Sequence, residues 1–193
     1  MSSDNQSPDS NIVELFDELT VRTDTPNTAI TVFCYGSAPG NHTARNQRNA
    51  TAGYACVFPD EPEMNASRAI EDGKDATNQR AILHAALNAL AIANDMDPKA
   101  ERELEVFSNS GYLNGAMNTY IEKWVKNGWR KADRKPVDNQ DLLKRILRRR
   151  GDRKISWMHF RNDVNPDRLV WAHKFHDQAE DVAKKAAREV VTP

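Results

Sequence analysis

Long apolar segments are missing from this 193-residue sequence. No stretch approaches the roughly 20 consecutive apolar residues that a membrane-spanning helix needs. The N-terminal region also lacks the charged and then apolar order of a secretory signal. We therefore expect a soluble, intracellular protein of the cytoplasm or nucleus, with no membrane partner. The length suits one domain with a full core and an additional tail.

Cysteine is scarce, since only Cys34 and Cys56 occur. Both lie within apolar runs, "TVFCY" and "GYACVF", where cysteine commonly acts as a small core residue. We favour core filling over the two alternatives, a disulfide or a metal ligand. Because no Cys and His residues stand at the spacing of a zinc site, the sequence predicts no metal site.

Net charge is also small, −1 for the whole chain, but it is unevenly distributed. The segment Lys123–Lys154 contains 13 Lys and Arg and 4 Asp, a net charge of +9, so the rest of the chain carries −10. Dense basic segments of this kind attract phosphate backbones. Trp124 and Trp129 lie within it, and we favour a surface that faces nucleic acid over a solvated helix and loop.

The pattern of apolar residues predicts the element order β-β-β-α-β-α-α-β-α. Strands are expected at 29–35, 50–58 and 67–70, followed by a helix over 77–94 with Thr or Asn available as its N-cap. A strand at 103–110, helices at 111–129 and 139–150, a strand at 154–160 and a helix at 176–190 complete the order. This order predicts an α/β fold in which helices pack on a mixed sheet.

Residues 1–27 are expected to form a separate tail before a domain that spans 28–193. The tail begins with the polar string "MSSDNQSPDS", which we expect to be disordered. It continues with "NIVELFDELTV", in which apolar residues recur at helical spacing. The second string predicts a short helix that docks on another surface.

Several strings follow the order and spacing of one family. "GSAPGN" is similar to its first turn, "TNQRAILHAA" to the start of its first helix, and "FSNSGYLNGAMNTYIEKWVKNGW" to its fourth strand and the helix that enters a basic handle. "KPVDNQDLLKRI", "ISWMHF" and "AEDVAKKAA" continue in step. From about Ala29 to Val190 the chain resembles the catalytic domain of cellular type 1 ribonuclease H, which cuts the RNA strand of RNA–DNA hybrids. The resemblance implies a ribonuclease H-like α/β fold, a five-stranded mixed sheet whose third strand is antiparallel, with helices on both faces. We expect no separate hybrid-binding domain upstream.

The same resemblance implies a degenerate catalytic site. The family hydrolyses phosphodiesters with two magnesium ions held by four carboxylates, because two such cations need several oxygen ligands and negative charges. Tyr35, Ile82 and Asn109 stand at three of these positions, and Asp181 stands at the fourth. A neutral phenol, an apolar side chain and a neutral amide thus replace three carboxylates. Of the four positions that the resemblance implies, only Asp181 keeps a carboxylate, so we expect no cofactor, with magnesium needed only if residual activity exists.

Positions that contact nucleic acid in relatives are better preserved. Hydroxyl and amide groups can donate to phosphate or to the ribose 2′-hydroxyl, which distinguishes RNA from DNA. Thr77 and Asn78 could equally be N-caps, and the two handle tryptophans could equally pack the helix on the sheet. The predicted binding residues, including cations of the handle, are Asn41, Thr77, Asn78, Gln79, Tyr120, Trp124, Lys126, Trp129, Arg130, Lys131, Lys135 and Asn139.

The sequence leaves three functional hypotheses open. The first is a catalytically inactive ribonuclease H-like protein that binds RNA–DNA hybrid or double-stranded RNA without cleaving it. The second is a protein-interaction scaffold, or a subunit of a larger complex or homo-oligomer, that uses the fold together with the segment "NIVELFDELT". The third is a residual metal-dependent endoribonuclease. Salt separates the first two, because affinity from phosphate contacts falls steeply with ionic strength.

Overall fold

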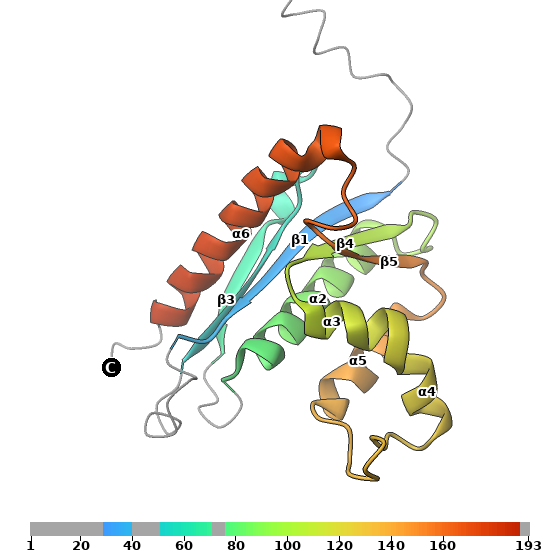
Figure 1. Ribbon diagram of the computed structural model, residues 1–193. Helices are drawn as coiled ribbons and strands as arrows, with labels where there is room; N and C mark the ends of the chain where they lie inside the picture. The colour runs from blue at the N-terminus through green and yellow to red at the C-terminus, as the bar shows by residue number, and fades with distance from the viewer. Residues whose placement is uncertain (1–28, 40–50, 71–75, 190–193) are drawn as a thin grey trace, which may run out of the picture.

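The computed structural model describes residues 29–39, 51–70 and 76–189, which contain a five-stranded sheet in the order β3-β2-β1-β4-β5. Figure 1 shows helices on both sides of this sheet, which confirms the expected α/β class. The predicted tail 1–27, its docking helix and Asn41 lie outside the described residues. The strands are β1 (Ile30–Ser37), β2 (Ala52–Val57), β3 (Ala66–Ile70), β4 (Leu104–Ser108) and β5 (Ile155–His159).

Strand β2 runs opposite to the other four strands. It pairs antiparallel with both β1 and β3, whereas β4 is parallel to β1 and β5 is parallel to β4. Because β1, β2 and β3 are consecutive neighbours that reverse direction twice, β3 returns to the direction of β1. The expectation that the third strand is the antiparallel one is therefore wrong.

The helices agree with the predicted order but differ in detail. The segment predicted as one helix over 111–129 consists of two short helices joined by a π-helical segment at Ala116–Tyr120. None of the described helices has both the length and the apolar content needed to cross a membrane. The helices are α2 (Asn78–Met96), α3 (Gly111–Gly115), α4 (Ile121–Lys126), α5 (Gln140–Arg150) and α6 (Leu169–Glu189).

The sequence pattern predicts that the final helix begins at His176. In the structure, helix α6 begins earlier, at Leu169. A short 3₁₀ turn at Pro166–Arg168 leads directly into it. The Asn165 side chain accepts a hydrogen bond from the backbone N–H of Asp167, and a proline in the first turn already has a helical φ. The earlier start places His176 well inside the helix.

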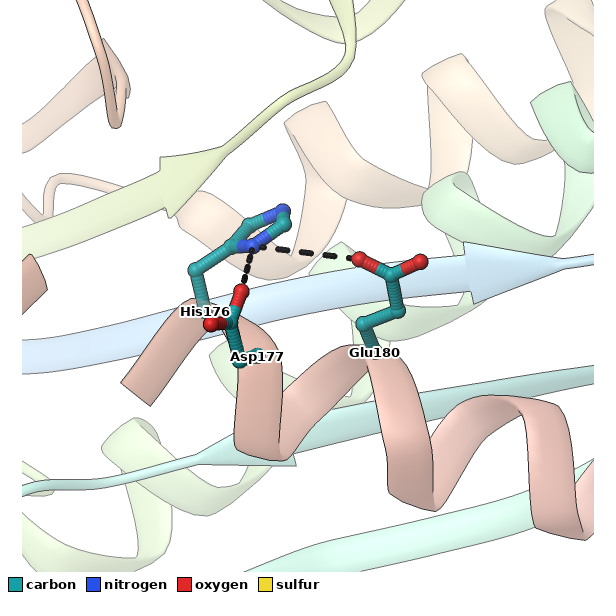
Figure 2. A group of neighbouring side chains, drawn as sticks. All are labelled: His176, Asp177 and Glu180. Atoms are coloured by element: carbon teal, nitrogen blue, oxygen red, sulfur yellow. Dashed lines mark hydrogen bonds and ion pairs between the residues drawn. The ribbon is translucent and has the colours of Figure 1, made fainter. Parts of the chain in front are cut away.

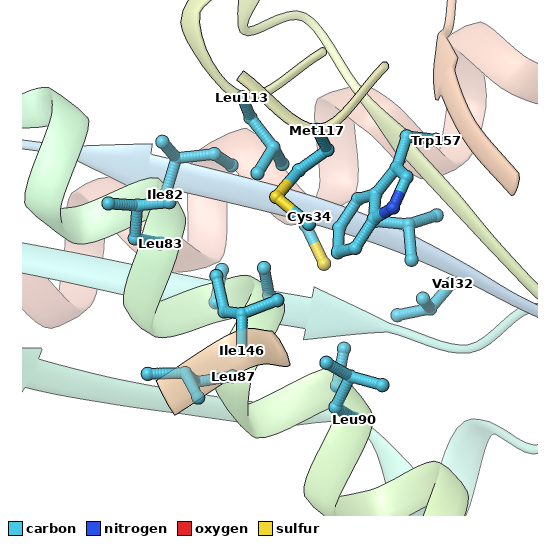
Figure 3. Packing of buried hydrophobic residues seen from close by; sticks show 14 of the residues in the cluster. Val32, Cys34, Ile82, Leu83, Leu87, Leu90, Leu113, Met117, Ile146 and Trp157 are labelled. Atoms are coloured by element: carbon cyan, nitrogen blue, oxygen red, sulfur yellow. The ribbon is translucent and has the colours of Figure 1, made fainter. Parts of the chain in front are cut away.

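Alternate residues of β1 face opposite layers of the fold. Val32 and Cys34 pack in the main core with α2, as Figure 3 shows. Phe33 and Tyr35 pack in a second core that includes the α6 residue Ala179. Because successive side chains of a strand point to opposite faces of its sheet, Tyr35 lies on the α6 side.

The two cysteines are neighbours on the α2 side of the sheet. Cys34 and Cys56 are direct partners across β1 and β2, and both are free and buried. The hydrogen bond with Cys56, together with burial, raises the pKa of Cys34. These thiols fill the core, as the sequence indicates.

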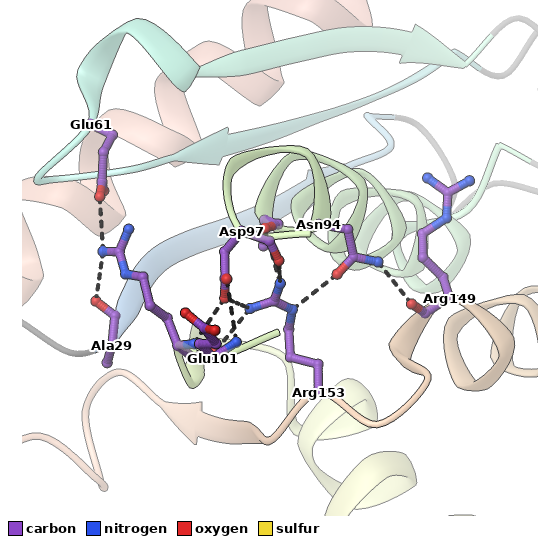
Figure 4. A network of polar contacts seen from close by, with 9 residues as sticks. Ala29, Glu61, Asn94, Asp97, Glu101, Arg149 and Arg153 are labelled. Carbon is purple, nitrogen blue, oxygen red and sulfur yellow. Dashed lines mark hydrogen bonds and ion pairs between the residues drawn. The ribbon is translucent and has the colours of Figure 1, made fainter. Parts of the chain in front are cut away.

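Arg153 is an exception within the basic segment Lys123–Lys154, because its side chain is fully buried. Its guanidinium donates to the Asp97 carboxylate at 2.9 Å and to the backbone carbonyl of Arg102 at 2.8 Å (Figure 4). The Asn94 amide oxygen accepts a further hydrogen bond from it at 2.9 Å. The interpretation of the whole segment as a surface for nucleic acid is therefore wrong at Arg153, which joins α2 to the chain before β5.

Candidate functional site

The carboxyl ends of the parallel strands β1 and β4 lie beside the start of α2, and a cavity of about 260 Å³ opens there. Ligands of open α/β sheets commonly bind at such an edge. The structure brings together in this cavity three positions that the resemblance assigns to metal-binding carboxylates: Tyr35, Ile82 and Asn109. The full lining is Tyr35, Gly36, Ser37, Asn78, Gln79, Ile82, Asn109 and Ser110.

Close packing of α2 on β1 fixes the place of Ile82. Gly36 lies against the backbone of α2, where an added Cβ would overlap the backbone nitrogen of Ile82. A glycine is therefore what allows the two elements to come so close. The Thr77 hydroxyl accepts a hydrogen bond from the backbone N–H of Arg80 at 3.1 Å and caps the helix. Ile82, only 3% exposed, then forms an apolar part of the cavity wall.

Tyr35 connects two of the elements around the cavity. Its half-buried phenol lies near Asn109, after β4, and near Glu180 of α6, and both side chains act on its pKa. Burial and the negative charge of Glu180 raise the pKa of Tyr35. The phenol is thus uncharged at neutral pH, and it offers a hydroxyl where a magnesium site would need a carboxylate.

Glu180 is the carboxylate that faces Tyr35, whereas its neighbour Asp181 is exposed to solvent. Adjacent residues of an α-helix point in directions about 100° apart, so the two carboxylates do not share this site. The Lys184 ammonium pairs with Glu180 at 2.5 Å. This contact lowers the pKa of Glu180 and raises the pKa of Lys184. The carboxylate beside Tyr35 is therefore already neutralised by a lysine of the same helix.

The magnesium pair implied by the resemblance does not fit these residues. Two Mg²⁺ ions require several oxygen ligands with enough negative charge to offset their mutual repulsion. Tyr35 and Asn109 are neutral, and Ile82 has no ligand atom. The carboxylate nearest to Tyr35 is held by Lys184.

A second group of ligand atoms lies on α6 (Figure 2), and the ring of one of its members, His176, meets the ring of Tyr35. It consists of His176 Nδ1 with one carboxylate oxygen each from Asp177 and Glu180, and these atoms all lie within 4.8 Å of one another. The spacing of His176 and Glu180 by four residues puts both on one face of the helix. The sequence does not show that this face turns toward Tyr35, so it gives no signal for this group.

Polar residues predicted to bind nucleic acid gather where α2 and α5 begin. The Asn139 amide donates to the Tyr112 hydroxyl at 3.1 Å and to the Gln79 side chain at 3.4 Å. The Asn78 amide oxygen accepts from the backbone N–H of Ala38 at 2.7 Å, which fixes that side chain at the cavity edge. Thr77 is the N-cap of α2. This is one of the two roles that the sequence leaves open for it.

The handle formed by α4 and the loop before α5 contains a second cavity, of about 330 Å³. Tyr120 and Trp124 stack at its side, with ring centroids 5.5 Å apart. Trp124 also packs against the main core, which is one of the two roles that the sequence leaves open for it. Trp129 packs against the same core and has the Lys144 ammonium 5.0 Å above its ring.

The predicted cations of the handle differ in their surroundings. Lys126 and Arg130 are exposed, and Arg130 lines the second cavity. Lys131 pairs with Asp138 at 3.0 Å and Lys135 with Asp133 at 3.4 Å. Exposed pairs of this kind are weak, so a phosphate could displace the carboxylates.

Comparisons with known proteins bear on the family and the fold of this chain. A family model described as RNase H matches residues 27–188. A ribonuclease H of Acetivibrio thermocellus is 37% identical over 97 residues, which are 48% of this chain and 63% of that relative. The chain thus spans less than two thirds of that relative's length.

Solved structures share the fold at low sequence identity. The foamy viral protease-reverse transcriptase in complex with dsDNA matches with a TM-score of 0.64 at 18% identity, covering 85% of this chain and 98% of that one. LC11-RNase H1 in complex with RNA/DNA hybrid matches with a TM-score of 0.54 at 18% identity, covering 84% and 99%. From the family match and the shared fold together, the chain belongs to the RNase H family as a type 1 RNase H-like domain.

Proposed function

We propose that this protein binds RNA–DNA hybrid or double-stranded RNA and does not cleave it. One observation carries the proposal: the cavity at the end of β1 brings Tyr35, Ile82 and Asn109 together without a carboxylate. Two-metal hydrolysis needs cations that stabilise both the attacking and the leaving oxygen. Without ligands to hold them, the reaction loses its nucleophile and its charge stabilisation.

The binding part of the proposal is supported by what remains at the surface. Asn78, Gln79 and Asn139 present neutral amides that can donate to phosphate or to a ribose 2′-hydroxyl. Tyr120 is 48% exposed and stacks on Trp124, as an aromatic that faces a nucleic acid would. LC11-RNase H1, which shares the fold, was solved with RNA/DNA hybrid.

Binding and cleavage are best measured in the same samples. A short labelled hybrid and a matched RNA duplex are incubated with the protein and Mg²⁺ or Mn²⁺ at about 50 mM and 200 mM salt. We expect affinity that falls steeply with salt while the RNA strand stays intact. The variant Asn139→Ala should weaken binding, whereas Asp152→Asn, at an exposed turn, should not.

Each alternative hypothesis has its own result in this experiment. Metal-dependent cleavage of the RNA strand would identify a residual nuclease and overturn the proposal. Absence of binding at the lower salt would also overturn it and would leave the protein-interaction scaffold as the better account. Affinity that is independent of salt would argue against phosphate contacts.

A further inference from the structure

Three side-chain amides gather where α2 and α5 begin, those of Asn78, Gln79 and Asn139. An amide has an acceptor oxygen and a donor nitrogen, so its orientation decides which ligand groups it can bind. The Asn78 oxygen accepts from the backbone N–H of Ala38 at 2.7 Å, and the Gln79 oxygen accepts from the Asn139 amide at 3.4 Å. Asn78 and Gln79 are exposed at the cavity, and their amide nitrogens have no partner among the described residues. The groups left for a ligand are therefore donors.

The Asn139 amide is held between two groups of opposite character. Its oxygen faces the Arg80 guanidinium, whose Nη1 lies 3.5 Å away, and its nitrogen lies 3.1 Å from the Tyr112 hydroxyl oxygen. A guanidinium can only donate, so it selects the amide oxygen. Two contacts of 3.0 Å with the Asp141 carboxylate fix the guanidinium in turn.

The Tyr112 hydroxyl selects the nitrogen of the same amide. It donates its hydrogen to the backbone carbonyl of Asp138 at 3.3 Å, so its oxygen is left to accept from Asn139. Burial raises the pKa of Tyr112, so the hydroxyl keeps its hydrogen at neutral pH. A reversed Asn139 amide would set its N–H groups against those of Arg80. The donor direction therefore runs from Asn139 through Tyr112 to Asp138.

The backbone at Asn139 agrees with a role outside α5. Asn139 is the N-cap of this helix, yet its side chain makes no capping hydrogen bond and its φ is 55°. An asparagine at an N-cap ordinarily accepts from an N–H of the first turn, and asparagine is one of the few residues that tolerate a left-handed conformation. Here the side chain reaches Gln79 of α2 and Tyr112 of α3 instead.

We infer that Tyr112 is a positioning residue, which turns the amides of Asn139 and Gln79 so that they offer N–H donors to nucleic acid. The inference rests on the proposed function and deepens it. With their oxygens occupied, the three amides form an edge that donates and does not accept. Such an edge suits phosphate oxygens and the acceptor atoms that bases show in the minor groove. The second N–H of Asn139 makes only the longer contact with Gln79, so a ligand can share it.

The test uses the full chain and a short labelled RNA–DNA hybrid, with affinities measured at several salt concentrations. Tyr112→Phe removes only the hydroxyl and is expected to weaken binding by about 2–10-fold, the effect of one lost hydrogen bond. Because no charge changes, the slope of log K against log salt should stay the same. Tyr54→Phe, which removes a hydroxyl from a buried residue of β2, is the matched control.

Two further measurements report the orientation of the amides. Gln79→Glu keeps the shape of the side chain but replaces its donor by a carboxylate oxygen, which should weaken binding by about tenfold or more. Gln178→Glu makes the same change at an exposed position of α6 and should have a much smaller effect. In the free wild type, NMR should show one Asn139 amide proton protected from exchange with water, and Tyr112→Phe should remove that protection.

The outcomes distinguish this inference from the proposed function. Weaker binding in Tyr112→Phe at an unchanged salt slope, with loss of amide protection, supports the positioning role. Wild-type affinity in Tyr112→Phe or Gln79→Glu, or equal weakening in the matched control, overturns it and leaves the proposed function in place. A wild type that does not bind hybrid at low salt overturns both. Circular dichroism checks the fold, and Gln79→Glu, at an exposed side chain, remains informative if Tyr112→Phe does not fold.

Discussion

At the scale of single residues, surroundings decide what a charged side chain does. Arg153 and Arg148 lie in the same basic segment, yet Arg153 is fully buried and Arg148 is exposed. A buried guanidinium is tolerated only when its charge and its N–H groups are satisfied. Asp97 supplies the charge, and carbonyls of neighbouring residues accept the remaining hydrogen bonds.

Removal of this guanidinium should therefore be costly. We expect Arg153→Met to lower the free energy of unfolding by about 3–5 kcal/mol, because it leaves the Asp97 carboxylate buried without its partner. Urea denaturation followed by circular dichroism measures the change. Arg148→Met is the control and should alter stability by no more than about 0.5 kcal/mol. Equal effects of the two substitutions would contradict the structural role of Arg153.

Asp97 should make the stability depend on pH in the acid range. A backbone hydrogen bond from Arg102 and one from the Arg153 side chain lower the pKa of Asp97. Because the folded-state pKa lies below the unfolded value of about 3.9, the stabilisation is present above that value and is lost as pH falls through the folded-state pKa. The urea midpoint of the wild type should fall more between pH 6 and about pH 3 than that of Asp97→Asn. If Asp97→Asn shows the same pH dependence as the exposed control Asp95→Asn, this assignment is wrong.

At the scale of elements, α6 lies unusually close to β2. Gly53 faces α6, and an added Cβ would overlap the backbone nitrogen of Ala187 and lie 2.5 Å from the carbonyl oxygen of Ala183. Backbone atoms cannot move aside as a flexible side chain can. Gly53→Ala should therefore push α6 away from the sheet and cost about 1–3 kcal/mol of stability.

Gly111 provides the matched control for this substitution. A Cβ added there meets nothing within 4 Å, and alanine is the better helix former. Gly111→Ala should leave the free energy of unfolding unchanged or slightly raised. Thermal unfolding of the two variants side by side measures the difference, and a stable Gly53→Ala protein would show that α6 can shift without cost.

The elements also show what the sequence could predict. Apolar periodicity and the cap at Thr77 located α2, whose core-facing residues recur at helical spacing. The same reasoning missed the first part of α6, because the 3₁₀ turn at Pro166–Arg168 and its asparagine cap read as a polar link. It also missed the π-helical segment at Ala116–Tyr120, which depends on tertiary packing and has no simple sequence signal.

The sequence predicts those residues of the candidate site whose place follows from the order of strands and helices. It does not predict which residues of α6 face the site, because that depends on how the helix is rotated about its axis. Tyr35, Ile82 and Asn109 meet in one cavity, as the resemblance implies. Whether Glu180 or Asp181 faces Tyr35 depends on how α6 is turned against the sheet, and close packing at Gly53 determines that. The group around His176 depends on the same rotation.

At the scale of the whole molecule, charge is distributed unequally between two helical regions. The basic handle around α4 and α5 lies apart from α6, which covers the far part of the sheet in Figure 1. The net charge of the chain is only −1, so general attraction of the whole protein to nucleic acid is weak. Binding through phosphates must therefore come from the local field of the handle.

Two triple variants with the same net charge can locate the phosphate contacts. We expect the triple substitution of Lys126, Arg130 and Lys131 by Gln to weaken hybrid binding and to flatten its dependence on salt. The slope of log K against log salt should fall by about 0.9 for each phosphate contact that is lost. Fluorescence anisotropy at several salt concentrations measures both quantities. The control replaces three exposed cations of α6, Lys174, Lys185 and Arg188, by Gln. Both variants lose the same charge, so equal weakening of hybrid binding would attribute the binding to net charge. Weakening only in the variant of Lys126, Arg130 and Lys131 would locate the phosphate contacts on the handle.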